Sequence, residues 1–430
     1  MQKTDYPHLG ETLYAKQLPN GLGVYVLPKK GFNKTYALLA TKYGSIDNDF
    51  GQTKAERQQV VDGIAHFLEH KLFEQSSGHD VFSQFSNYGA SVNAYTSYTH
   101  TAYLFSCTSN LPQNLLFLLD FVQAPYFTNE NVAKEKGIIT QELQMYADDP
   151  DWRLRLNFLQ ALFKVAPLRI DIGGTPESIL KITKEALYHC YQTFYHPSNM
   201  ALCIVGALDP HEIINLVAAN QAEKKFAPIK PIYRYLPQEP DQLNKIYHEQ
   251  KMPVGVPKIL FGFKERAKNL KQINKKLQFE LLTELVLEIT FGLGSTWFQD
   301  LYQAGLIDNS FGYEYSLFNN YAFSTMGGSS PDPAKVIKII KEWLPSYITQ
   351  GLKQADFDRI KRKELGFWLS ALDSPEFIAK QFLNYKFNGD DFFEIIPLLN
   401  SLTLAEANER LRQHFDQEQL CFSVIKPLDN

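Results

Sequence analysis

The chain has 430 residues, of which 44% are hydrophobic and 21% are charged, and its formal net charge is −4 at pH 7. This length predicts at least two domains with a large core, and the composition is typical of a globular protein rather than a disordered or fibrous one. The small net charge gives no reason to expect a nucleic acid or a membrane surface as a partner.

The sequence also predicts the cellular compartment of the protein. The stretch from Met1 to Tyr6 lacks the apolar core of a signal peptide, and the apolar run from Leu115 to Val122 is too short to span a bilayer. The four cysteines are scattered and form no Cys-x-x-Cys pair. We therefore expect a cytoplasmic protein in which nitrogen and oxygen, not sulfur, would hold a metal ion.

The pattern of the first half of the chain predicts strands, then helices, then a final strand. Residues 12–19 and 23–27 alternate like strands on either side of an Asn20-Gly21 hairpin turn, and residues 36–43 form a third strand. Further along we expect a helix over residues 80–87, a strand pair over 91–98 and 101–108, helices over 111–123, 130–147 and 152–164, and a strand over 201–206. This order predicts a layered α+β unit with a mostly antiparallel sheet covered by helices.

The stretch from His66 to His70 carries the strongest chemical signal. Two histidines four residues apart lie on one face of a helix, so both imidazoles can hold one Zn²⁺. Glu69 shares this face and can reach a water on the metal, as amide hydrolysis requires of a general base. This is the inverted zinc-peptidase motif His-x-x-Glu-His. The alternative is a histidine pair with no metal, which the rarity of the whole motif disfavours.

A catalytic zinc needs a third protein ligand and an open position. The downstream candidates are Glu74, Asp80, Glu130, Glu135, Glu142 and Asp148. In the predicted helix over residues 130–147, Glu135, Ile138, Ile139 and Glu142 recur at helical spacing, which would place both carboxylates on an apolar face. A buried glutamate needs a positive partner, and a metal would supply it. On these grounds alone, a solvated position for Glu142 is an equal alternative.

The segment from His66 to His70, followed by Lys134-Glu135 and by Glu142, resembles the pitrilysin/insulinase family, which includes the mitochondrial processing peptidases. Further matches are the stretch from Asn93 to Thr96, the stretch from Gly173 to Ile179, and the stretch from Tyr195 to Met200. The resemblance implies that Glu142 is the third zinc ligand and that Glu135 supports the site from behind. It also implies that residues 91–96 form a free sheet edge to which a peptide adds as a strand, with Asn93 and Ala94 positioning the substrate.

The second half repeats the first without its metal ligands. Residues 182–205 align with 402–425 at an offset of 220, and residues 78–89 align with 294–305 at an offset of 216. Carrying the second offset to the motif places Leu282 and Val286 where His66 and His70 stand, and neither side chain binds zinc. We therefore predict two homologous α+β domains related by duplication.

The predicted domains are a zinc-bearing catalytic domain over residues 1–222 and a homologous domain without zinc ligands over residues 246–430. Residues 223–245 are predicted to be a Pro-rich linker between them. Four closely spaced prolines in this segment exclude continuous secondary structure.

The resemblance also implies an arginine and a tyrosine from the second half, which hold the carbonyl or the developing oxyanion. Residues 298–310 contain no arginine, and Tyr302 stands near the expected place, with Tyr313 or Tyr315 as substitutes. We therefore expect a zinc metallopeptidase for short or unfolded peptides that carries one zinc per chain. We further expect it to pair with a similar chain that has the Arg/Tyr pair, or to form a homodimer. The alternative is a non-proteolytic scaffold or maturation partner with a structural zinc.

Overall fold

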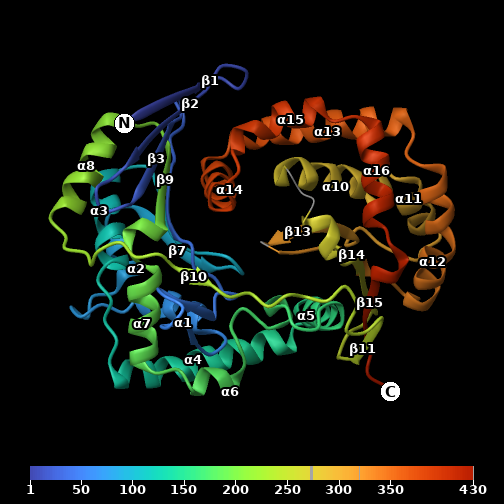
Figure 1. Ribbon diagram of the computed structural model, residues 1–430, viewed down its shortest axis with the longest axis horizontal. Coiled ribbons are helices and arrows are strands. Elements are labelled where there is room, and N and C mark those ends of the chain that lie inside the picture. The colour runs from blue at the N-terminus through green and yellow to red at the C-terminus, as the bar shows by residue number, and fades with distance from the viewer. Residues whose placement is uncertain (272–274, 319, 430) are drawn as a thin grey trace. The chain divides into compact units, whose positions relative to one another are not determined.

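The computed structural model describes residues 1–271, 275–318 and 320–429, which form two compact units (Figure 1). The first unit consists of Met1–Leu143, Asp171–Leu236 and Leu369–Phe392. The second consists of Gln144–Ile170, Pro237–Trp368 and Phe393–Asn430. The protein is mixed α and β, as the sequence predicts.

The first unit is built on a seven-stranded sheet with the order β1-β2-β3-β9-β4-β8-β7. All neighbouring pairs are antiparallel except β3 and β9, which are parallel. The strands are β1 (Gln2–Tyr6), β2 (Glu11–Gln17), β3 (Gly23–Pro28), β4 (Thr35–Thr41), β7 (Ala90–Thr96), β8 (Thr101–Cys107) and β9 (Met200–Gly206). The predicted hairpin at Asn20-Gly21 joins β2 to β3, and Gly21 adopts a φ of 91°, which suits glycine.

Helices cover both faces of this sheet. Four of them pack on the strands from one side, and the alternate residues Ala37, Leu39, Leu202 and Ile204 of β4 and β9 join the same core. They are α1 (Ile64–Leu72), α2 (Val81–Asn87), α3 (Leu111–Val122) and α8 (Pro210–Ala222). On the other side α14 (Pro375–Asn388) packs on β4 and β9, which explains why every residue of those two strands is buried.

The remaining elements of the first unit surround this sandwich. They are α4 (Asn129–Asp148), of which the last turn is assigned to the second unit, α6 (Pro176–Leu180), α7 (Lys184–Phe194) and the 3₁₀ turn η2 (Pro197–Asn199). A small sheet with the order β10-β5-β6 joins β5 (Asp49–Gly51), β6 (Gln58–Gln59) and β10 (Tyr233–Arg234). Strand β10 thus gives the predicted Pro-rich linker one short paired segment.

The second unit repeats the central part of the first. Its sheet has the order β11-β15-β12-β14-β13, and only β11 and β15 are parallel. This is the pattern of β3-β9-β4-β8-β7. The strands are β11 (Tyr247–Lys251), β12 (Lys258–Phe263), β13 (Gly312–Phe318), β14 (Tyr321–Ser329) and β15 (Leu420–Lys426).

The helices of the second unit follow the predicted offsets. Helix α16 (Leu404–His414) lies 220 residues after α7, as β15 lies 220 residues after β9, and α11 (Thr296–Gln303) begins 215 residues after α2. The others are α5 (Pro150–Leu162), η1 (Pro167–Arg169), α9 (Ala267–Lys271), α10 (Lys276–Phe291), α12 (Pro333–Gln350), α13 (Gln354–Ala371), which ends in the first unit, η3 (Phe392–Glu394), α15 (Ile395–Ser401) and η4 (Gln417–Gln419).

The units differ from the predicted domains because the two halves exchange helices. The chain passes between units at Leu236–Pro237, inside the predicted linker. However, α5 belongs to the first half of the sequence and packs on β12 and β15 of the second unit, whereas α14 belongs to the second half and packs on the first. Each compact unit therefore contains segments from both of the ranges 1–222 and 246–430, since each sheet is covered on one face by a helix from the other half of the sequence.

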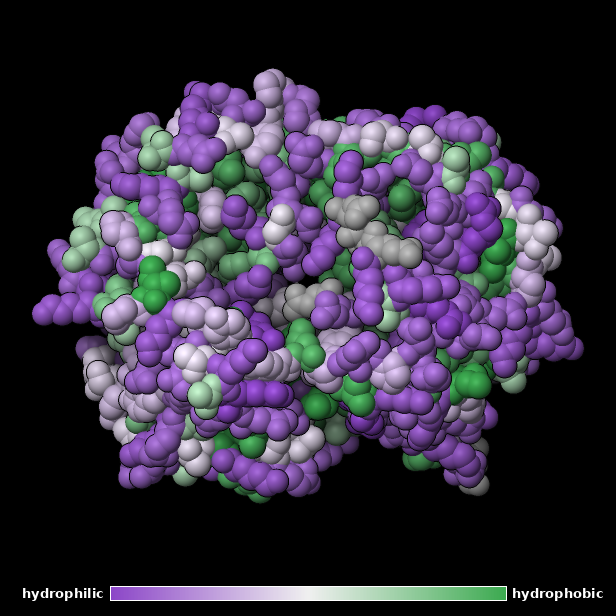
Figure 2. All heavy atoms as spheres, viewed as in Figure 1, coloured by the Kyte–Doolittle hydropathy of each residue, from purple (hydrophilic) through white to green (hydrophobic). Residues whose placement is uncertain are grey.

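Hydrophobic side chains are mostly inside. The face shown in Figure 2 is largely hydrophilic, with scattered hydrophobic residues. One segment, Lys276–Gln303, is long and apolar enough to resemble a membrane span, but most of it is buried inside the second unit. Burial against the sheet of that unit accounts for its apolar composition.

Candidate metal centre

Helix α1 begins at a close contact with a glycine-rich segment. Gly63, which precedes the helix, has a φ of 86°, and a Cβ there would lie 2.3 Å from the carbonyl oxygen of Gly173. A Cβ on Gly173 would in turn lie 2.7 Å from Leu143 and 3.5 Å from Nδ1 of His66. Glycine is needed at position 63, where the backbone of Gly173 leaves no room for a side chain, so the Gly173-Gly174 segment fixes the start of the helix that carries His66.

The structure brings the three predicted ligands together. Nε2 of His66 lies 3.8 Å from Oε1 of Glu142, and Nε2 of His70 lies 3.4 Å from Oε2 of the same carboxylate. One donor atom from each residue lies within 4.8 Å of the others. Tetrahedral zinc with ligand bonds of ~2.0–2.1 Å separates its ligand atoms by about 3.4 Å. Two nitrogens and one oxygen at this spacing are therefore a donor set that fits zinc.

Glu135 supports His70 from behind. Nδ1 of His70 lies 3.1 Å from Oε1 of Glu135, where its N–H donates to the carboxylate and leaves Nε2 to face Glu142. Burial opposes the charged form of Glu135, but the hydrogen bond and the charge of His70 outweigh it and lower the pKa of Glu135. A carboxylate on the far nitrogen orients a ligating histidine and raises its basicity.

The two imidazoles differ in their affinity for protons. Burial, together with the charge of His70, lowers the pKa of His66 to about 3, so this ring is neutral at physiological pH. Burial also opposes protonation of His70, but its hydrogen bond to Glu135 and the charges of Glu142 and Glu69 raise its pKa. His66 is thus ready to bind a metal, whereas His70 must release a proton more often before it binds one.

Glu69 is buried in the same turn of α1 and is held by the neighbouring sheet. The hydroxyl of Thr96, at the end of β7, donates to Oε2 of Glu69 at 2.5 Å. Burial raises the pKa of Glu69 to about 6, although the Thr96 hydrogen bond and the charge of His70 oppose the shift. Such a carboxylate is poised to take up and release a proton near neutral pH.

The other carboxylates considered as ligands are engaged elsewhere or lie outside the cluster. Glu74 pairs with Lys71, Asp80 caps α2, and Asp148 accepts a hydrogen bond from Gln144. In α4 the predicted apolar face is wrong at one position. Ile139 is fully buried but Ile138 is 44% exposed, because the buried stripe runs through Val132, Glu135, Ile139 and Leu143 instead.

Strand β7, which contains Asn93 and Ala94, is the edge of its sheet and packs beside α1. Asn93 is exposed, and its side chain accepts a hydrogen bond from the backbone N–H of Ala94. The Ala94 amide therefore bonds to a side chain of its own strand. Because Thr96 of this strand contacts Glu69, the free edge passes directly beside the candidate metal ligands.

Among its described residues, the second unit does not repeat the centre. Leu282 and Val286 are buried apolar residues of α10. Tyr315 is buried and packs edge-on against His414, and the Tyr313 hydroxyl donates to Glu288 at 2.7 Å. Tyr302 is exposed on α11, where its ring stacks on Phe298. Of the three tyrosines considered from the sequence, Tyr302 is exposed, Tyr313 is half-buried and Tyr315 is buried.

A second polar cluster has the serine–histidine–carboxylate contacts of a serine-hydrolase triad. His414 Nε2 lies 2.8 Å from the Ser324 hydroxyl, and its Nδ1 lies 3.0 Å from Oε2 of Glu265. All three residues are buried, and Arg410 pairs with the same carboxylate. Burial opposes ionisation of Glu265, but the charge of Arg410 and the hydrogen bond and charge of His414 together outweigh it and lower the pKa of Glu265 to about 2. No substrate reaches a buried serine, so this cluster holds α16 on its sheet.

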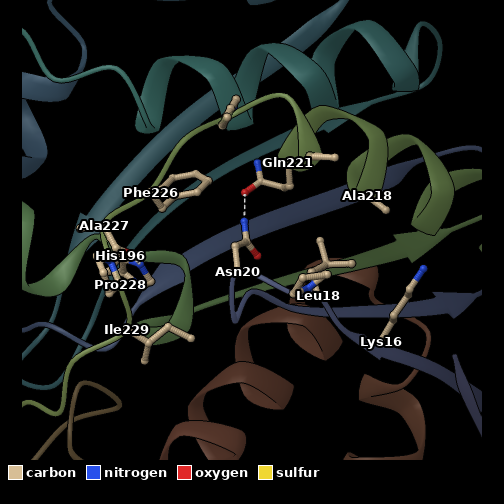
Figure 3. A pocket seen from close by; sticks show the side chains of 13 residues that line it. Lys16, Leu18, Asn20, His196, Ala218, Gln221, Phe226, Ala227, Pro228 and Ile229 are labelled. Carbon is tan, nitrogen blue, oxygen red and sulfur yellow. Dashed lines mark hydrogen bonds between the residues drawn. The ribbon is translucent and has the colours of Figure 1, made fainter.

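A cavity of about 680 Å³ lies elsewhere in the first unit (Figure 3). It is formed by the β2–β3 turn, the end of α8 and the following segment, and Asn20 donates to Gln221 at its centre. None of the metal-centre residues lines it. This cavity is therefore separate from the candidate metal centre.

Sequence reasoning missed two residues of the centre. Thr96 was part of the recognised strand segment, but its contact with Glu69 depends on how β7 packs on α1. Lys71 directly follows His70 and is fully buried, with Nζ 3.7 Å from Oε2 of Glu135. A lysine inside an apolar helix segment was the available signal.

Comparison with known proteins places this geometry in a family. The sequence model described as insulinase (peptidase family M16) matches residues 54–176, and the one described as peptidase M16 inactive domain matches residues 181–364. The uncharacterized zinc protease YmfH of Bacillus subtilis is 46% identical over 98% of both chains.

Two solved structures share the whole fold. The crystal structure of an M16-like peptidase from Alicyclobacillus acidocaldarius has a TM-score of 0.93 and 37% identity, covering 99% of this chain and 100% of that one. A protease from Helicobacter pylori has a TM-score of 0.83 and 19% identity, covering 96% of this chain and 99% of the other, which supports the fold alone.

Proposed function

The chain belongs to the insulinase family of zinc proteases, peptidase family M16, and on this premise we propose that it is a zinc endopeptidase that hydrolyses short or unfolded peptides. We propose one zinc per chain, held by His66, His70 and Glu142. We further propose that it acts in the cytoplasm.

The position of Glu69 carries the proposal. A purely structural zinc site has no use for a buried carboxylate next to its ligands, and burying that charge costs stability. Thr96 occupies Oε2 of Glu69, so Oε1 is the oxygen that accepts the proton of the attacking water and later delivers it to the leaving amine nitrogen. A pKa near 6 allows both transfers at neutral pH.

Bound zinc would supply Lewis acidity, which polarises the scissile carbonyl and lowers the pKa of water. Its ligands carry one negative charge in total, from Glu142, so the site keeps a positive charge for this task. Glu135 fixes the ring of His70, and the Gly173 contact fixes the start of the helix before His66.

The peptide would bind as an additional strand on the free edge of β7. Main-chain hydrogen bonds to the edge are largely independent of the peptide sequence, which suits unfolded substrates. We propose that Asn93 and Ala94 position the peptide. The Asn93 side chain would release the Ala94 amide, which then donates to a substrate carbonyl.

We propose that a second, similar chain completes the active site, with a homodimer as the other form of pairing. The second half has no arginine between residues 298 and 310, its Tyr315 is buried and its Tyr313 is bonded to Glu288. The same observations favour the second candidate function, a non-proteolytic scaffold or maturation partner with a structural zinc.

A peptidase assay separates the two functions. Purified chain, with and without co-expressed paralogue, is incubated with a quenched fluorescent peptide library in zinc, in EDTA, and after zinc is restored. If the chain is a zinc endopeptidase, it should cleave peptides in zinc, lose this activity in EDTA and regain it when zinc is restored. The Glu69→Gln variant should retain zinc but cleave no peptide. Stoichiometric zinc with no cleavage in any combination would favour the scaffold.

A further inference from the structure

Lys71 is an unusual residue for its position. It follows His70 in α1, and its side chain is completely buried. A buried ammonium group requires negative partners, since its removal from water is otherwise unfavourable. Its partners are Glu74, which is partly exposed, and Oε2 of the buried Glu135 at 3.7 Å.

The two oxygens of Glu135 serve different neighbours. Oε1 accepts the hydrogen bond from Nδ1 of His70, whereas Oε2 faces Nζ of Lys71. Lys71, Glu135 and His70 therefore form a continuous chain of contacts that ends at the imidazole nitrogen facing Glu142. A change at Lys71 is transmitted to that imidazole through the orientation and charge of a single carboxylate.

The charges around the centre explain why a cation is needed there. Glu69, Glu135 and Glu142 bring three carboxylates to one small region, and only Glu142 would bind the metal directly. In a buried site, each negative charge disfavours the ionised form of its neighbours. Lys71 places a positive charge beside Oε2 of Glu135 and so holds the carboxylate whose other oxygen contacts His70.

We propose that Lys71 is a positioning residue of the metal centre, which acts through Glu135 to orient His70 and tighten zinc binding. This inference rests on the proposed zinc site and extends it. The family resemblance concerns the ligands and Glu135, whereas the role of Lys71 follows from its burial and its contacts.

The test measures zinc affinity by competition with a fluorescent chelator, independently of peptidase activity. Lys71→Met keeps the length of the side chain and removes its charge, and it should weaken zinc binding about 10-fold or more, the range typical of residues behind metal ligands. Lys71→Arg, which retains the charge, should restore most of the affinity. Lys29→Met is the matched control, because the Lys29 side chain is only 11% exposed and pairs with the buried Glu11 instead.

A double-mutant cycle separates positioning from general stabilisation. In the Glu135→Gln background, Lys71→Met should cause little further loss of zinc affinity, because the carboxylate that transmits the effect is already neutral. Lys71→Gln provides a second neutral variant if Lys71→Met does not fold, as judged by circular dichroism.

The outcomes distinguish this inference from the function on which it rests. If the wild-type chain binds no zinc, the proposed function and the inference fall together. If the wild type binds zinc but folded Lys71→Met and Lys71→Gln bind it equally well, only the inference is overturned. Losses that multiply in the double variant would also overturn it, since Lys71 would then not act through Glu135.

Discussion

Replacing Glu69 with glutamine should stabilise the metal-free protein while abolishing peptide hydrolysis. Burial raises the pKa of Glu69 from 4.5 to about 6. At about 1.4 kcal/mol per pKa unit, the ionised carboxylate costs the folded state about 2 kcal/mol above pH 6. Glutamine has the same shape, can accept the Thr96 hydrogen bond, and carries no charge.

The sign of the pH dependence follows from the raised pKa. The protonated acid is favoured in the folded state, so its contribution is fully present below pH 4.5 and is lost as the pH rises through about 6. The stability difference between Glu69→Gln and wild type should therefore be near zero at pH 4.5 and grow to about 2 kcal/mol at pH 7.

Urea denaturation in EDTA provides the assay. All four tryptophans, Trp152, Trp297, Trp343 and Trp368, lie in the second unit, so their fluorescence follows that unit, whereas circular dichroism follows both. The variant should shift the dichroism transition of the first unit and leave the tryptophan transition unchanged. Glu342→Gln, at an exposed carboxylate on α12, is the control and should change stability by less than about 0.5 kcal/mol.

The result that refutes the reasoning is a Glu69→Gln protein that is less stable than wild type at pH 7, or whose stability difference does not vary between pH 4.5 and 6. Either outcome would mean that the Glu69 carboxylate is compensated in the folded state. The high pKa, and with it the assignment of Glu69 as the general base, would then lose its physical basis.

Three further predictions concern the contact of Thr96 with Glu69, the ionisation of Glu69 and the buried pair of Arg410 with Glu265. Thr96→Val removes the donor to Glu69 and should lower kcat about tenfold or more, with unchanged zinc affinity; unchanged kcat would contradict the contact. The kcat/KM of the zinc enzyme should fall on the acid side with a midpoint at or below about pH 6, because zinc favours the ionised form of Glu69; a midpoint near pH 8 would exclude it as the base. Arg410→Met leaves Glu265 buried without its cation and should destabilise the second unit by about 3–5 kcal/mol in tryptophan-detected urea denaturation; a loss below 1 kcal/mol would show that the pair is dispensable.

Local patterns in the sequence predicted the parts of the fold that depend on local geometry. The Asn20-Gly21 turn, the alternation of the strands beside it and the helical spacing of His66 and His70 require only neighbouring residues. The offset of 220 residues also holds element by element, because a duplicated chain keeps its turns and caps, such as Thr183 and Thr403 at the starts of α7 and α16.

Contacts between distant segments were beyond the sequence pattern. The exchange of α5 and α14 depends on which sheet face remains uncovered, and amphipathic periodicity does not identify the sheet against which a helix packs. Ile138 was misplaced for a related reason, since several stripes of α4 have apolar residues and packing selects one. The contacts of Lys71 with Glu135 and of Thr96 with Glu69 likewise join separate elements.

The swapped helices make the two halves of the gene product interdependent. A fragment that ends at residue 236 would lack α14, and β4 and β9 would present a bare apolar surface to water. Neither half should therefore behave as an autonomous module when it is expressed alone. A protease nick between residues 228 and 240 in the mature protein should, by contrast, leave two pieces that co-elute, because each retains a helix embedded in the other's sheet.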